Sequence, residues 1–168
     1  MSSNPASIST RSILASVAPM LGVTPCRWGK IMRDARECPQ MPCHPGHALL
    51  IRWMVAHPGH SPQLIAPSPA EYLDRLQTVS DTRITVQWLG LALGAHGSAG
   101  HRWVSLGDEV NPVRRRALGL LDTADPGLLQ IRWDECCANA RLEARLRGLG
   151  DLDSRLSWTN KSVLKNAA

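Results

Sequence analysis

Apolar residues recur along the chain at helical spacing, and proline and glycine separate the apolar stretches. Several stretches begin with a side chain that can cap a helix, followed directly by proline, which is tolerated there because its missing N–H would have no partner. The pattern predicts helices over 11–21, 25–35, 46–56, 69–78, 84–93, 98–106, 112–121, 126–147 and 152–165. The capped starts are Thr24, Ser68, Asn111 and Asp125, and Glu71 completes a capping box with Ser68.

Four prolines between His57 and Pro69 interrupt the helical pattern. So many prolines exclude a helix and favour a semi-rigid linker. We therefore expect a first module over 1–58, a linker over 59–68, a second module over 69–126 and a C-terminal helical segment over 127–168 that packs or dimerises.

Composition favours an all-α fold. The chain of 168 residues has no Phe and one Tyr, and it is rich in Leu, Ala and Arg, which lose little on entering a helix. No apolar run approaches 18 residues, so neither export nor membrane spanning is expected. Five cysteines, two of them adjacent at Cys136 and Cys137, indicate reduced thiols and a cytoplasmic location.

A short pattern occurs twice, around Leu21-Gly22 and around Leu93-Gly94. In each copy, glycine supplies the positive φ of a tight turn between two helices, and a small residue precedes it. Apolar anchors follow on the inner face of the second helix: Trp28 and Ile31 in the first copy and Trp103 in the second. In the second copy Gly100 takes the place of an anchor, so we expect a loss of packing there.

The first copy, Leu-Gly-Val-Thr-Pro over 21–25, resembles the Cro/C1-type (lambda-repressor-like) helix-turn-helix family, in which such a stretch opens a recognition helix. The second copy resembles it through the pair Arg102-Trp103 and through Gly107. The resemblance covers 11–58 and 84–126. It implies two tandem helix-turn-helix modules, each completed by the apolar helix that follows it, and a DNA-binding transcriptional regulator of bacterial or mobile-element type.

The candidate DNA contacts lie on the outer faces of the two recognition helices, whose N-terminal residues enter the major groove in this family. The net charge is +5, and most of the basic excess falls in the first third of the chain, beside the first copy. We expect double-stranded DNA as the partner and a nucleoid-associated protein. The candidates are Thr24, Pro25, Arg27, Lys30 and Arg33 in the first copy and His96, Ser98, His101, Arg102 and Ser105 in the second.

An alternative function is an all-α protein-interaction subunit that uses the same geometry to dock on a partner protein. Trp53, Trp88 and Trp158 are its surface candidates, since exposed tryptophan is common at interfaces. The run from Arg114 to Arg116 is a solvated helix face or a phosphate contact. The C-terminal helix carries an apolar stripe that serves core packing or forms a homodimer or hetero-oligomer; it comprises Leu128, Leu129, Ile131, Trp133, Ala138, Leu142, Leu146 and Leu149.

The sequence contains few candidate catalytic or metal-binding residues. Cys38, Cys43, His44 and His47 offer four zinc donors within ten residues. Their spacing matches no zinc finger, however, and buried thiols with solvent-facing histidines are the competing interpretation. We find no nucleophile elbow, phosphate-binding glycine loop or paired carboxylates, so we expect neither enzymatic activity nor a cofactor.

Overall fold

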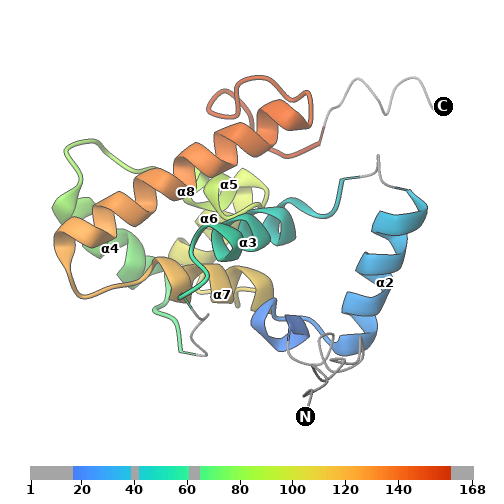
Figure 1. The fold of residues 1–168 in the computed structure, drawn as a ribbon. Coiled ribbons are helices and arrows are strands. Elements are labelled where there is room, and N and C mark those ends of the chain that lie inside the picture. Colours follow the sequence, from blue (N-terminus) through green and yellow to red (C-terminus); the bar gives the residue numbers. More distant parts are fainter. Residues whose placement is uncertain (1–16, 39–41, 61–64, 160–168) are drawn as a thin grey trace, which may run out of the picture.

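The computed structural model describes residues 17–38, 42–60 and 65–159, and over these ranges it is helical and contains no strand (Figure 1). This confirms the all-α prediction. None of its helices is long and apolar enough to cross a membrane. Residues 17–20 are helical, and the helices that follow are α2 (Pro25–Glu37), α3 (Pro45–Ala56), α4 (Pro69–Val79), α5 (Val86–Ala92), α6 (Gly97–Ser105), α7 (Pro112–Leu121) and α8 (Pro126–Leu146).

The predicted helix starts are confirmed. Thr24, Ser68, Asn111 and Asp125 each accept a hydrogen bond from a backbone N–H in the first turn, and Glu71 closes the capping box. Further caps that the sequence analysis did not predict come from His44, Thr85 and His96. These caps satisfy N–H groups that have no partner inside the helix.

The longest helix, α8, crosses the molecule and packs against α3, α4, α5 and α7 (Figure 1). The main cluster of buried side chains draws on both predicted modules: Leu21 and Leu50 belong to the first, and Leu89 and Trp103 to the second. The two modules therefore share one core. Residues 61–64 of the predicted linker lie outside the described residues.

The C-terminal segment departs from the prediction in two ways. Residues 152–159 are not helical, and 160–165 lie outside the described residues. Instead the segment runs back over α5 and the start of α6, where the Trp158 indole donates to the Leu91 carbonyl (3.1 Å). The apolar stripe predicted for the last helix also divides: Leu129, Trp133 and Leu149 are buried, whereas Leu128, Ile131, Leu142 and Leu146 are exposed.

A buried ion cluster fixes α3 to α8. The Glu143 side chain, 9% exposed, accepts from Arg52 (2.7 Å) and from Arg147 (2.7 and 2.9 Å). Burial disfavours the charged carboxylate, but hydrogen bonds from the two guanidinium groups outweigh it and lower the pKa of Glu143. Arg147 also donates to the Cys43 carbonyl (2.6 Å), so the cluster holds the segment that leads into α3.

Candidate nucleic-acid interface

The two predicted turns have the same backbone structure. Gly22 and Gly94 adopt φ of 66° and 72°. In the first turn the Gly22 N–H donates to the carbonyl three residues back and the next N–H to the carbonyl five residues back, both at 3.0 Å. The second turn repeats these bonds at 2.9 and 2.8 Å. This glycine-centred helix end is the Schellman motif, so the repeat found in the sequence is a repeat of structure.

Each turn packs on the helix that follows the other copy. A Cβ on Gly22 would lie 2.7 Å from the carbonyl carbon of Pro112 at the start of α7, and one on Gly94 would lie 2.6 Å from the Cα of Gly46 in α3. The starts of α3 and α7 also meet, since a Cβ on Gly46 would be 3.7 Å from Val113. Each turn therefore contacts the third helix of the other copy, a reciprocal packing that the sequence did not predict.

Arg114 reaches into this junction. Its guanidinium donates to the Gly94 carbonyl (2.9 Å) and lies 6.0 Å from the ring centroid of Trp103. Burial lowers the pKa of the Arg114 guanidinium. The neighbouring Arg115 pairs with Glu109 at 2.8 Å. The run from Arg114 to Arg116 was expected to be a solvated helix face or a phosphate contact, and Arg114 instead has a structural role in this junction.

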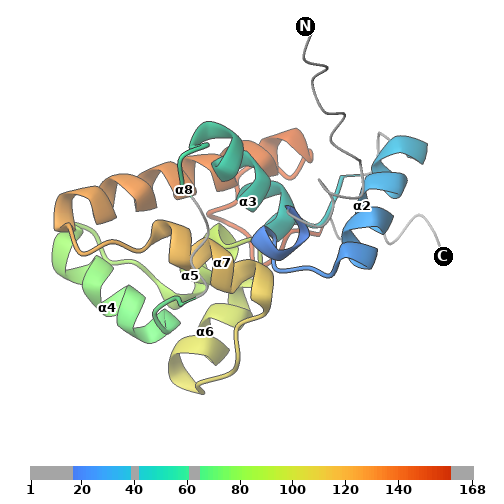
Figure 2. The same ribbon diagram turned by 60° about the horizontal axis from the view of Figure 1, so that its bottom comes forward.

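The first recognition helix, α2, projects from the other helices in both views (Figures 1 and 2). Its inner face is narrow, because only Trp28 is buried and Ile31 is half-buried. No acidic residue lies in its first turn. The Thr24 hydroxyl caps the helix by accepting from the Arg27 N–H (3.2 Å). All five candidates of the first copy are exposed: Thr24, Pro25, Arg27, Lys30 and Arg33.

The second recognition helix, α6, is more enclosed. Its candidates are also exposed, namely His96, Ser98, His101, Arg102 and Ser105. The His96 ring, however, caps the helix by accepting from the Ser98 N–H (3.1 Å), and Arg102 lies 3.8 Å from Asp108. The Gly97 N–H donates to the Leu156 carbonyl (2.8 Å). The C-terminal segment therefore covers the end of α6 that would enter a groove.

The proposed zinc donors do not form a cluster in the described residues. No three histidine, cysteine or acidic side chains gather there as a metal site would require. The His44 Nδ1 accepts from the Gly46 N–H (3.2 Å), Cys38 is exposed at the end of α2, and burial raises the pKa of the Cys43 thiol. His47 is buried in α3, so the interpretation of solvent-facing histidines is wrong for this residue.

The tryptophans proposed for a protein interface are largely covered. Trp53 is 4% exposed, so the prediction that it lies on the surface is wrong. Trp88 and Trp158 are half-buried, and both carry an arginine close to the ring: Arg141 lies 4.8 Å from the Trp88 centroid and Arg147 lies 5.9 Å from that of Trp158.

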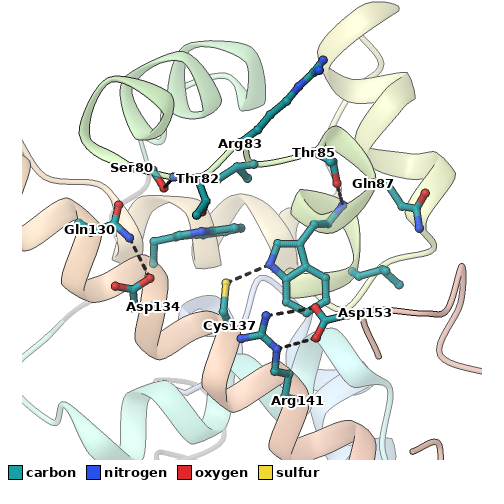
Figure 3. A pocket seen from close by; sticks show the side chains of 14 residues that line it. Ser80, Thr82, Arg83, Thr85, Gln87, Gln130, Asp134, Cys137, Arg141 and Asp153 are labelled. Atoms are coloured by element: carbon teal, nitrogen blue, oxygen red, sulfur yellow. Dashed lines mark hydrogen bonds and ion pairs between the residues drawn. The ribbon is translucent and has the colours of Figure 1, made fainter. Parts of the chain in front are cut away.

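A hollow of about 340 Å³ lies between α8 and the loop that joins α4 to α5 (Figure 3). The Trp88 indole donates to the Cys137 thiol (3.2 Å) at its floor. Burial raises the pKa of that thiol to about 12, so it stays protonated. Arg141 and Asp153 form a two-hydrogen-bond ion pair at the rim (2.9 and 3.1 Å).

No known protein family, curated protein or solved structure matches this chain.

Proposed function

We propose that this chain is a non-enzymatic, sequence-specific double-stranded DNA-binding protein, a cytoplasmic, nucleoid-associated transcriptional regulator of bacterial or mobile-element type. The observation that carries the proposal is the repeated turn: two identical glycine-centred turns each present a helix with an exposed polar outer face. A helix held by a fixed turn on a shared core is suited to entering the major groove.

The first copy supports DNA contact more strongly than the second. Arg27, Lys30 and Arg33 are exposed on a helix that projects from the core. Arginine and lysine can contact guanine edges or neutralise phosphates, and the positive end of the helix dipole adds to both. In the proposed complex α2 reads the groove, while the exposed residues of α6 make a second, weaker contact.

Because the two copies differ, the proposed target is a pair of unequal half-sites rather than a perfect palindrome. The reciprocal packing of Gly22 on α7 and Gly94 on α3 joins the two turns directly. The spacing between the half-sites would then be fixed by the protein and not by a linker.

The test is selection of a motif from random duplex DNA at physiological salt, followed by titration of that motif. Wild-type protein is expected to enrich a defined sequence. Changing Arg27 and Lys30 together to alanine should weaken binding by about 2 kcal/mol, or roughly 30-fold. A charge-matched control replaces Arg83 and Arg155, which lie outside α2, α6 and α8, and should leave affinity within about threefold.

Two results would refute the proposal: no enriched motif, or equal losses in the two double variants. Equal losses would mean that only net charge matters, as in non-specific binding.

The second candidate function, a protein-interaction subunit, is favoured by one observation at α6. The Leu156 carbonyl occupies the Gly97 N–H, and the one arginine on the outer face lies near Asp108. Such a face is close to neutral and better suited to a protein than to phosphates. Loss of DNA enrichment together with a stable, stoichiometric protein partner would support this function.

A further inference from the structure

The outer face of α8 carries an apolar stripe, interrupted at Glu135, that no segment covers in the described residues. Four of the nine large hydrophobic side chains exposed in these residues lie on it: Leu128 (38%), Ile131 (63%), Leu142 (37%) and Leu146 (68%). The other five are scattered over different segments. From Leu128 to Leu146 the stripe runs about 27 Å at the rise of an α-helix. Exposed apolar side chains arranged in this way typically mark an interface.

The spacing of the stripe fits helix pairing. Leu128 and Leu142 lie two heptads apart and Ile131 and Ala138 one heptad apart, so these four residues share one face of α8, on which Glu135 also lies. At the middle of the stripe the exposed Ala138 is small enough to let two helix backbones approach.

Glu135 does not interrupt the seam with an unpaired charge. Its carboxylate is turned aside to the His57 ring, with 2.7 Å between Oε1 and Nε2.

Charge along α8 determines which partner fits. The exposed or half-exposed acidic residues of α8, Asp134 and Glu135, lie in its N-terminal half, and Arg141 and Arg145 lie in its C-terminal half. Glu135 also pairs with His57, and Arg141 pairs with Asp153. Arg132, in the N-terminal half, is turned inward and donates to the carbonyls of Leu120 and Asp122.

If a second α8 runs antiparallel to the first, the acidic half of each helix lies beside the basic half of the other. In a parallel pair, halves of like charge would lie together. Antiparallel helix dipoles favour the same orientation.

We propose that the chain self-associates as an antiparallel dimer through the Leu128–Leu146 face of α8. In this dimer Leu128 of one chain packs against Leu146 of the other, and Ile131 packs against Leu142. The two Ala138 residues lie near the twofold axis. Asp134 and Arg141 flank the seam on the side of the hollow in Figure 3. One helix from each chain is a small interface, so the dimer dissociates in the micromolar range. This inference is independent of DNA binding.

Sedimentation equilibrium of the full chain, without DNA, tests the association. The wild type is expected to show a concentration-dependent monomer–dimer equilibrium. Ile131→Asp puts a carboxylate into the seam and should raise the dissociation constant at least about 10-fold. The matched control is Ile65→Asp, at a side chain 86% exposed outside α8, and it should change the constant by less than about twofold. Circular dichroism melts verify that both variants stay folded.

Orientation is tested by oxidative cross-linking in a chain whose exposed Cys26 and Cys38 are serine. Leu128→Cys should form a disulfide with a chain carrying Leu146→Cys and should not link to itself, since the two Leu128 positions lie at opposite ends of the seam. A monomer at all concentrations, an equal effect of Ile65→Asp, or self-linking of Leu128→Cys would each overturn the proposal.

Discussion

Gly100 in α6 lies directly against the Val86 carbonyl in α5: a Cβ on Gly100 would overlap the carbonyl oxygen and lie 2.8 Å from the carbonyl carbon. This contact is between backbones, so no side chain can move away. The glycine that interrupts the apolar anchors of the second copy is therefore what lets α5 and α6 pack at this distance, and the expected loss of packing does not occur.

Gly100→Ala should lower the free energy of unfolding by about 2 kcal/mol, because overlap with Val86 exceeds the gain in helix propensity. Gly29→Ala in α2 is the matched control, since nothing lies within 4 Å of a Cβ there. It should stabilise by up to about 1 kcal/mol. Urea unfolding of both variants measures the difference, and similar values for the two would contradict the close approach.

The reciprocal packing of the two turns gives a second prediction. Gly94 and Gly148 both end a helix with φ near +70° and with the same pair of backbone hydrogen bonds. A Cβ at Gly148 meets nothing within 4 Å, whereas one at Gly94 meets Pro45 and Gly46. Gly148→Ala should therefore cost about 1 kcal/mol for the left-handed backbone alone, and Gly94→Ala roughly 3 kcal/mol. Equal losses in thermal or urea unfolding would mean that the turn does not rest on α3.

Much of the local structure could be predicted from the sequence, because capping and glycine turns are decided by a few neighbouring residues. Thr24 and Asn111 mark their helix starts through their own hydrogen bonds. Gly22 and Gly94 mark the two turns for the same reason. Which helix each turn rests on could not be predicted, since that depends on contacts between residues far apart in the chain.

The candidate DNA contacts show the same division. Exposure of Arg27 and Lys30 follows from their spacing relative to buried Trp28 on one helix. The hydrogen bond from the Gly97 N–H to Leu156 could not be predicted. It depends on the path of the C-terminal segment, which the hydrophobic pattern had assigned to a helix. Trp53 is buried because α8 packs on α3, which hydrophobic spacing within α3 alone does not reveal.

The Glu143 ion cluster predicts a pH-dependent contribution to stability. Glu143→Gln leaves Arg147, whose side chain is 10% exposed, beside Arg52 without a counter-charge, and should cost about 3 kcal/mol at neutral pH. Because folding lowers the pKa of Glu143, this stability is fully present above its ordinary value of 4.5 and is lost as the pH falls through the lower folded value. The difference between variant and wild type should therefore shrink below pH 4.5 in urea unfolding.

The control for the ion cluster is Asp153→Asn, which removes the exposed pair with Arg141. Both side chains of that pair are nearly half exposed, at 46% and 47%, so the loss should stay under about 1 kcal/mol. If the two substitutions destabilised equally, burial of the Glu143 cluster would not be the source of its contribution.

His47 gives the last prediction, because the charge of Arg27, a candidate DNA contact, acts on its buried ring. Burial lowers the pKa of His47 below its ordinary 6.5, and the positive charges of Arg27 and Arg114 lower it further. The folded state therefore binds this proton less readily than the unfolded chain, and stability should fall as the pH drops from 6.5 through the folded pKa. A titration of the ring signal by NMR should show the lowered pKa.

Arg27→Ala should raise the His47 pKa toward 6.5, whereas Arg83→Ala, which removes the same charge from an arginine that does not act on His47, should leave it unchanged. A DNA phosphate bound beside Arg27 would neutralise the positive charge that lowers the His47 pKa. Saturating the protein with its selected duplex should therefore also raise that pKa. By linkage, DNA affinity should then increase as the pH falls below 6.5 toward the pKa of His47 in the free protein. A His47 titration that responds to Arg27→Ala but not to DNA would place the duplex away from the start of α2.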